Sequence, residues 1–411
     1  MSAAPRPAVL LGTQLVFNVG FYAVVPFLAV VLRDDYLLGG AAVGLVLGVR
    51  TFAQQGLFLL GGILTDLLGA RRLILLGCAV RVAGFAALAL APGLGVLVLG
   101  AVLTGLGGAL FSPAVETLVA RAEAARPPGP ATRSSLFALL AVVGETGAVL
   151  GPLLGAALFG WGFTTVALSG AALFACVGVA LVRLIPAGTD APSHASARAR
   201  ADDLRSGLSL RHRRFVAFAL LHAVNLLAWN QLYLGLPAEL QRVGAGPVAL
   251  GVLLAVVSAV TITLQIPVAR LARRLGPRVA LPAGYCLIAA GFAVLAVAAP
   301  MAPPAWSTAP ALGAAVLLTL GHLTVGPTAL DLVPRFADGR PLGSYYGLLA
   351  TCGGVVVLLL SVPLGAWYVA ASTPGPGASL PWAVLTVLPL CSALGMAALL
   401  RRMPTRTAVP A

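Results

Sequence analysis

Three ionisable side chains stand within long apolar segments of this 411-residue chain, namely Arg50, Arg81 and Glu145. A charge inside a bilayer costs about 3 kcal/mol or more, so such residues are candidates for function. Glu145 lies about 11 residues into its segment, roughly 17 Å deep at the rise of an α-helix. A carboxyl at that depth can bind and release a proton, and we interpret all three residues as the proton-coupling group. The alternative is a structural ion pair between Glu145 and one of the arginines, and the sequence leaves both readings open.

Amide and aromatic side chains form a second pattern. In the first apolar segment they recur every four residues and share one helix face, at Gln14, Asn18 and Tyr22. A shift of 211 residues aligns them with Asn225, Trp229 and Tyr233. Two equivalent helices with such faces predict a cavity wall for bulky, amphipathic molecules. The alternative is that these side chains hold helices together.

Two further polar residues belong to the predicted cavity. Gln54 follows Arg50 by one helical turn, and His322 stands in an apolar segment of the second half of the chain. A histidine can titrate near neutral pH, although a lone histidine in an apolar helix is more often a packing residue.

The composition shows which elements must position these residues. Apolar residues make up 60% of the chain and charged residues 9%, against about 25% charged in soluble proteins. This excludes a soluble enzyme and a disordered chain, and predicts an all-α membrane protein. We predict twelve spans, at 9–32, 41–65, 73–91, 94–119, 134–158, 162–185, 215–237, 246–269, 279–299, 309–333, 342–369 and 382–400.

The basic residues fix the expected orientation. All 26 are arginines, and all but four (Arg33, Arg50, Arg81 and Arg242) fall in loops and tails on one side of the predicted spans. By the positive-inside rule both termini are expected in the cytoplasm, in a multi-pass protein of the cell membrane. The net charge of +14 therefore does not indicate nucleic-acid binding.

The chain has the pattern of two related halves. A shift of 207 residues aligns Gly69 with Gly276 and Arg71 with Arg278. Segment 186–213 is rich in arginine, serine and proline and reads as a cytoplasmic linker. We therefore predict an N-terminal six-helix bundle at 1–185, the linker at 186–213, and a C-terminal six-helix bundle at 214–411.

The predicted loop between spans 2 and 3 combines a flexible turn with opposite charges, at Gly62, Asp66, Gly69, Arg71 and Arg72. Gly69 permits a sharp reversal, and the carboxylate and arginines can form a charge-assisted latch. We predict a gating loop, with an ordinary basic turn as the alternative.

Span 5 carries three glycines at a spacing of four residues, Gly147, Gly151 and Gly155, and Pro152 directly follows the second of them. Glycines four residues apart share a helix face and let a neighbouring helix approach closely, and Pro152 favours a bend. A general packing seam explains the same spacing.

These motifs carry a resemblance to a known family. The loop after span 2 resembles the signature loop of the major facilitator superfamily, and the span-5 glycines resemble the antiporter motif of its drug:proton antiporters. Local runs such as Gly48 to Gly56 look most like the MdtH type. In span 4 Ala101 stands where many relatives carry a buried arginine, so a relay through that arginine is absent.

The resemblance implies a secondary transporter without enzymatic activity, which exports amphipathic drugs or metabolites in exchange for protons by alternating access. No ATPase, metal or cofactor motif is present in the sequence, and the five cysteines show no ligand spacing. The expected partners are a small-molecule substrate, protons and the lipid bilayer, with the protein a monomer. An uptake symporter for a nutrient and a non-transporting membrane protein remain the alternatives.

Overall fold

Every regular element that the structure describes is a helix. The computed structural model describes residues 6–124, 136–185, 212–301, 307–337, 342–373 and 375–401. Within these ranges, eleven helical stretches are long and apolar enough to cross a membrane, and a bent pair provides a twelfth if it counts as one span. The predicted all-α membrane architecture is confirmed. The predicted linker, 186–213, lies almost wholly outside the described residues.

The N-terminal half contains seven described helices: α1 (Pro7–Asp34), α2 (Gly40–Gln55), α3 (Phe58–Leu68), α4 (Ala70–Ala89), α5 (Leu94–Ala124), α6 (Leu136–Phe159) and α7 (Phe163–Leu184). Helices α2 and α3 form the bent pair, with an angle of 41° between them. Helix α1 packs against α6 and α7, and α4 packs against α5 and α7.

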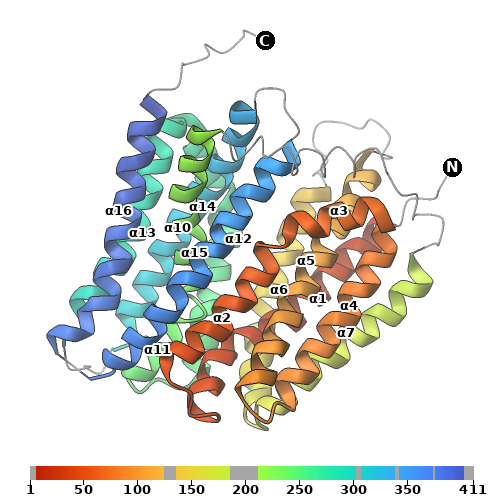
Figure 1. Cartoon of the computed structure of the whole chain (residues 1–411), viewed down its shortest axis with the longest axis horizontal. Helices are drawn as coiled ribbons and strands as arrows, with labels where there is room; N and C mark the ends of the chain where they lie inside the picture. Colours follow the sequence, from red (N-terminus) through yellow and green to blue (C-terminus); the bar gives the residue numbers. More distant parts are fainter. Residues whose placement is uncertain are drawn as a thin grey trace.

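The C-terminal half contains α10 (Arg213–Asn230), α11 (Gly235–Arg242), α12 (Pro247–Leu275), α13 (Pro277–Ala298), α14 (Ala309–Ala337), α15 (Leu342–Ala370), the 3-10 helix η2 (Pro376–Ser379) and α16 (Leu380–Arg401). Helix α13 packs against α14 and α16, and α10 packs against α15. We call the end of the molecule where α1 begins and α16 finishes the terminal end, and the opposite end the far end (Figure 1).

The internal repeat has a structural counterpart. Gly69 and Gly276 both have positive φ, at 90° and 73°, and each separates two consecutive helices. Arg71 Nε then donates to the carbonyl oxygen of Ile185 at 2.9 Å, just after α7. Arg278 Nε donates to the carbonyl oxygen of Leu400 at 3.2 Å, in the last turn of α16. In each half an arginine thus satisfies a carbonyl at the end of the last helix, where no backbone donor is available.

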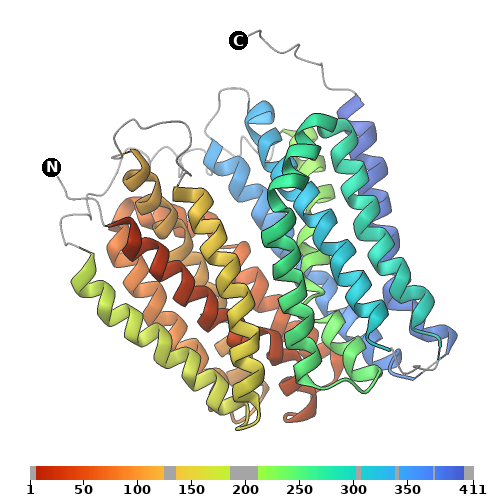
Figure 2. The same ribbon diagram turned by 180° about the vertical axis from the view of Figure 1, so that it is seen from behind.

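The two halves meet most closely between α2 and α15 near the far end. A Cβ atom added at Gly40 would lie 1.8 Å from the carbonyl oxygen of Gly365, and one added at Gly44 would lie 1.9 Å from the carbonyl oxygen of Ser361. Only glycine permits this approach. At the bend between α2 and α3, Thr351 Oγ1 of α15 donates to the carbonyl oxygen of Gly56 at 3.2 Å. Figures 1 and 2 show the helices of the two halves converging at the far end and diverging toward the terminal end.

Candidate functional site

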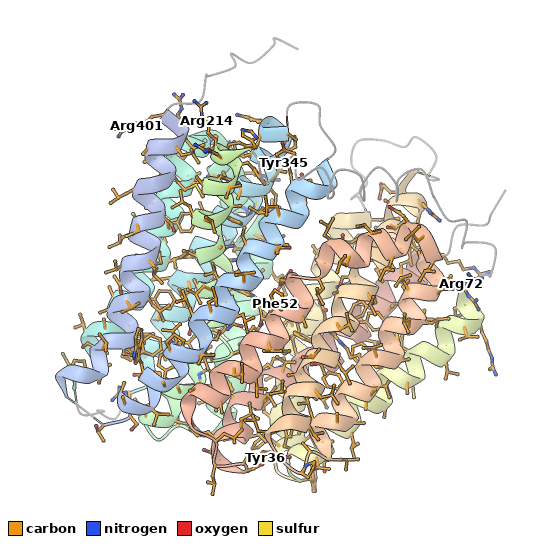
Figure 3. The ribbon with its side chains drawn as sticks, in the orientation of Figure 1. Tyr36, Phe52, Arg72, Arg214, Tyr345 and Arg401 are labelled. Carbon is orange, nitrogen blue, oxygen red and sulfur yellow. The ribbon has the colours of Figure 1, made fainter. Side chains whose placement is uncertain are left out.

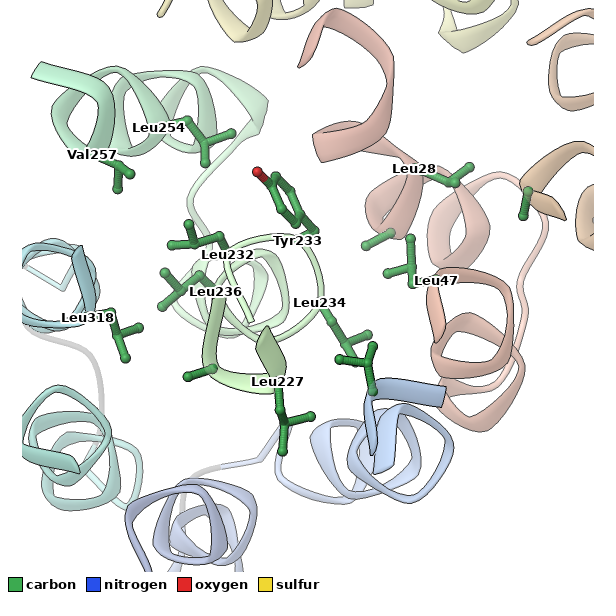
Figure 4. Packing of buried hydrophobic residues seen from close by; sticks show 14 of the residues in the cluster. Leu28, Leu47, Leu227, Leu232, Tyr233, Leu234, Leu236, Leu254, Val257 and Leu318 are labelled. Carbon is green, nitrogen blue, oxygen red and sulfur yellow. The ribbon is translucent and has the colours of Figure 1, made fainter. Parts of the chain in front are cut away.

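The two halves share a central cavity about halfway along the helices. Tyr22 and Glu145 line it from the N-terminal half, and Trp229 and Tyr233 line it from the C-terminal half. Figure 4 shows Tyr233 beside Leu232 and facing Leu254 and Val257 of α12, which complete an apolar wall. The free volume is about 20 Å³, enough for one water molecule. A larger molecule therefore needs these walls to move apart.

The span-5 glycines explain how Glu145 reaches this cavity. Cβ positions built at Gly147 and Gly151 lie 2.6 Å from Cβ of Asn18 and Cβ of Tyr22. No larger residue fits, so these glycines bring α6 directly onto α1. Asn18 Nδ2 also donates to the carbonyl oxygen of Gly144 at 2.9 Å, which fixes the turn that carries Glu145. The predicted motif and the predicted polar face are thus two sides of one helix contact.

The other two members of the motif extend the contact. Gly155 packs on the carbonyl of Ala23 in α1. Pro152 lines the central cavity, and its carbonyl oxygen lies 3.5 Å from the Cβ position of Gly251 in α12. Helix α6 therefore touches α1 through one face and the other half through a neighbouring face.

Glu145 is half-buried, and within the described residues its carboxylate has no ion pair and no hydrogen bond. Its neighbours are aromatic. The rings of Tyr22 and Tyr233 lie 6.5 Å apart across the interface between the halves. Both tyrosines lie close enough to Glu145 and to Arg50 to interact electrostatically with each. The two tyrosines therefore interact with both the acidic and the basic group of the site.

Arg81 lies inside the N-terminal half rather than against Glu145. Its side chain is 2% exposed, and its Nε and Nη2 donate to the carbonyl oxygen of Thr104 at 3.1 and 2.9 Å. The guanidinium carbon lies 4.8–5.1 Å from the ring centres of Phe21, Phe111 and Phe174. Three aromatic faces and one carbonyl stabilise this cation in place of a carboxylate.

Arg50 also lacks a carboxylate partner among the described residues. It is 5% exposed, and it donates to Gln54 Oε1 at 3.3 Å and to Thr51 Oγ1 at 3.0 Å. Its guanidinium carbon lies 5.2 Å from the ring centre of Phe21. The structural Glu–Arg ion pair, which the sequence left open, is not formed in this arrangement.

Three of the predicted cavity residues form a cluster in the C-terminal half. Trp229 stacks on His322 with ring centres 4.1 Å apart, and His322 Nδ1 lies 3.1 Å from Asn225 Oδ1. Asn225 and Trp229 come from α10 and His322 from α14. Of this cluster, Trp229 lines the cavity, whereas His322 and Asn225 lie outside its lining. Gln14 lies on the same side of α1 as Asn18, 3.6 Å from the Cβ position of Gly144.

A polar network across the halves was not predicted. Thr51 Oγ1 donates to Asn230 Oδ1 at 3.0 Å, and Asn230 Nδ2 donates to Ser361 Oγ at 3.5 Å. Next to it, Tyr368 OH donates to Gln231 Oε1 at 2.7 Å. The sequence feature that indicates this network is the pair of adjacent amides Asn230 and Gln231, which directly follow Trp229 in an apolar segment.

A second contact across the halves lies at the far end. Arg33 Nη1 donates to Gln241 Oε1 at 2.5 Å, and Gln241 Nε2 donates to Asp34 Oδ2 at 2.7 Å. One amide of α11 is thus held by an arginine and a carboxylate of α1. From the sequence, Arg33 was expected only as a charge on the side opposite most of the arginines, and nothing in its spacing indicated this contact.

The predicted gating loop lies at the terminal end. Asp66 is half-buried in the last turn of α3, and Gly62 lies one turn earlier. Arg71 Nη2 donates to the carbonyl oxygen of Val182 at 2.8 Å, in addition to its bond to Ile185. Arg72 is exposed and points away from the bundle (Figure 3). The loop therefore ties the start of α4 to the end of α7, within one half.

Comparisons with known proteins give one consistent answer. A family model described as the Major Facilitator Superfamily matches residues 10–361. An uncharacterized MFS-type transporter of Mycobacterium tuberculosis is 33% identical, over 89% of this chain and 87% of the relative. The multidrug resistance protein MdtH of Klebsiella pneumoniae is 30% identical, over 92% of this chain and 89% of the relative. These relatives confirm the resemblance to the MdtH type.

Solved structures agree on the fold. A peptide transporter POT in complex with sulfate has a TM-score of 0.77 at 17% identity, covering 97% of this chain and 95% of that chain. The nucleoside transporter NupG has a TM-score of 0.74 at 13% identity, covering 96% and 99%. All of these proteins are transporters and none is an enzyme, as expected from the sequence. The chain belongs to the Major Facilitator Superfamily and is a multi-pass membrane transporter.

Proposed function

We propose that this transporter exports amphipathic drugs or metabolites in exchange for protons, with Glu145 as the proton carrier. The observation that carries the proposal is the position of its carboxylate. It lines a cavity between the halves, beside Tyr22, Trp229 and Tyr233, and no basic side chain within the described residues neutralises it.

Antiport requires that binding of the proton and binding of the substrate to the transporter are mutually exclusive. An ionised Glu145 attracts a positively charged or hydrogen-bond-donating group of a substrate, and the aromatic walls hold its apolar body. Protonation removes that attraction and favours release. The coupling of export to proton entry follows from this competition for one carboxylate.

Arg50 and Arg81 have a supporting role in this proposal. Both cations are fixed by carbonyl, hydroxyl and amide oxygens and by the Phe21 ring, so they stay in place when Glu145 gains or loses its proton. Of the two, Arg50 interacts electrostatically with Tyr22 and Tyr233, which line the cavity. In this proposal the arginines supply a fixed positive charge near the cavity and do not carry the proton.

The gating loop and the glycine motif have separate roles. We propose that Gly62, Asp66, Gly69, Arg71 and Arg72 act as the gating loop at the terminal end, where Arg71 holds the start of α4 on the end of α7 within the N-terminal half. The span-5 motif keeps α1 and α6 together as one rigid unit, so that Tyr22 and Glu145 move as a pair.

The proposed setting follows from the charges. By the positive-inside rule, the arginine-rich segments favour a cytoplasmic position for both termini and a far end at the outer face of the cytoplasmic membrane. The buried apolar residues of the two halves form one continuous cluster within the chain, and the protein is expected to act as a monomer.

The test uses everted membrane vesicles with an acid interior and a pH-sensitive dye. Wild type, Glu145→Gln and Glu116→Gln are compared, since Glu116 is a carboxylate of α5 outside the cavity. We expect an amphipathic substrate to release protons from wild-type and Glu116→Gln vesicles, and not from Glu145→Gln vesicles.

Two results contradict the proposal. Proton release by Glu145→Gln at the wild-type rate would remove Glu145 as the carrier. Substrate accumulation that proceeds together with proton movement in the same direction would show symport.

A further inference from the structure

A cavity at the far end, lined by residues of both halves, has no role in the proposed exchange. This outer cavity has a volume of about 180 Å³. A cavity of about 150 Å³ holds a benzene molecule, so the outer cavity accommodates a group of the size of one aromatic ring.

The walls of the outer cavity come from both halves. Phe159 of α6 forms one side, and Leu240 of α11 and Leu250 of α12 form the other. Leu240 and Leu250 are 3% and 2% exposed, so the inner wall of the outer cavity is apolar and tightly packed. Such walls favour an apolar ring over water.

The mouth of the outer cavity is acidic. Asp34 and Asp35, both exposed, belong to its lining, and the lining contains no basic residue. The nearest arginines have other partners: Arg33 donates to Gln241, and Arg242 forms an ion pair with Glu239 at 2.7 Å. One oxygen of Asp34 accepts a bond from Gln241, and Arg33 interacts electrostatically with the same carboxylate. Asp35 is therefore the carboxylate of the mouth for which the described residues provide no basic partner.

The outer and central cavities lie along one seam. Both are lined by α1, α6 and α12 together with the span formed by α10 and α11. From Tyr22 to Val30 in α1 the distance is roughly 12 Å along the helix axis. Between them, the Cβ position of Gly251 lies 3.2 Å from Ala156, so the two spaces are separated by a tight contact.

We propose that the outer cavity is a separate binding site for a compact organic ammonium ion. The ring lies against Phe159, Leu240 and Leu250, and the ammonium group lies at Asp34 and Asp35. Because both halves supply the walls, a bound ligand stabilises the arrangement in which the far end is closed. Binding at this site does not require Glu145, which lies outside the lining.

The test measures binding of benzylammonium to the purified full-length protein, with benzyl alcohol as the neutral probe of the same shape. Loss of a partly exposed charge interaction weakens binding by about fivefold. We therefore expect wild type to bind benzylammonium about five times more tightly than benzyl alcohol. Asp35→Asn is expected to remove most of this difference, and Asp331→Asn, an exposed carboxylate at the terminal end, to leave it unchanged.

Steric variants identify the cavity itself. Ala245→Phe fills the lining, whereas Val248→Phe, a few residues on, adds the same bulk at a position that is 68% exposed and outside the lining. Binding is expected to be lost only in Ala245→Phe. Glu145→Gln is expected to bind like wild type, so this result does not depend on the proposed transport mechanism. Every variant is checked for folding by size-exclusion chromatography.

Three outcomes overturn the proposal. These are equal affinity for the charged and neutral probes, loss of binding in Glu145→Gln with retention in Ala245→Phe, and no saturable binding to folded wild type at millimolar probe.

Discussion

Replacement of Gly44 by alanine should change the conformational equilibrium more than the stability of the fold. A Cβ atom at Gly44 would lie 1.9 Å from the backbone carbonyl oxygen of Ser361 in the opposite half. No side-chain rotation removes this overlap, so α2 must move away from α15. The close packing exists only while the far end is closed, and the overlap is relieved when the halves separate there.

The expected magnitude comes from overpacking. An added methyl group in a tight interface costs about 1–3 kcal/mol, which corresponds to a shift of about 5- to 150-fold away from the state with the closed far end. In both states alanine also stabilises the helix by about 1 kcal/mol relative to glycine. Gly48→Ala should act more weakly, since its Cβ position lies 3.1 Å from Cβ of Ser361 and needs only a small adjustment.

The assay is a distance measurement between spin labels at the terminal end, at Arg72 and Arg401, after replacement of the five native cysteines. Both positions are exposed and belong to opposite halves (Figure 3). Gly313→Ala is the control, because its Cβ position has nothing within 4 Å. Gly44→Ala should increase the population with short label distances, in which the terminal end closes. If Gly44→Ala and Gly313→Ala give the same distance distribution in folded protein, the argument from the glycine contact is wrong.

Three further predictions use the same structure. Gly151→Ala should reduce transport because the added methyl group displaces Tyr22, an overpacking that costs about 1–3 kcal/mol. The label distances should stay at wild-type values, and a shift of these distances would show that the contact is not confined to one half. Gln241→Ala removes two hydrogen bonds to charged groups and should destabilise the closed far end by about 1–2 kcal/mol, a five- to thirtyfold change in the populations measured by the same label distances. An unchanged distance distribution would show that the amide does not stabilise this conformation. Trp229→Ala should raise the KM for an aromatic substrate by about two- to tenfold in vesicle transport, with less effect on an aliphatic one; equal effects on both would place Trp229 outside the binding surface.

The fold was largely predictable because the lipid bilayer permits few kinds of backbone structure. A chain that is 60% apolar can satisfy its backbone in lipid only as helices, and the lengths of the apolar segments gave the spans. The repeat was visible because positions such as Gly69 and Gly276 need the same positive φ in both halves. The bend at Gly56 could not be read from the sequence, since its carbonyl is satisfied by Thr351, almost 300 residues further along the chain.

The candidate site was predictable in its residues more than in its contacts. Tyr22, Glu145, Trp229 and Tyr233 do line one cavity. Periodicity identifies the face of a helix but not the partner of a charge, so it gave no sign that Arg81 is satisfied by Thr104 and three phenylalanines. The network of Thr51, Asn230 and Ser361 was missed for the same reason: its members lie in three separate spans.

The glycines of this chain illustrate why identical sequence signals have different consequences. Gly40, Gly44 and Gly48 repeat every four residues in α2, as Gly147, Gly151 and Gly155 do in α6. The α6 glycines pack against α1 in the same half, a contact that a rocking motion of the halves preserves. The α2 glycines pack against α15 in the other half, a contact that the same motion must break. One motif therefore builds the rigid unit that carries Tyr22 and Glu145, and the other stabilises one conformation of the transporter. Only the identity of the partner helix separates these roles, and that information is in the tertiary structure.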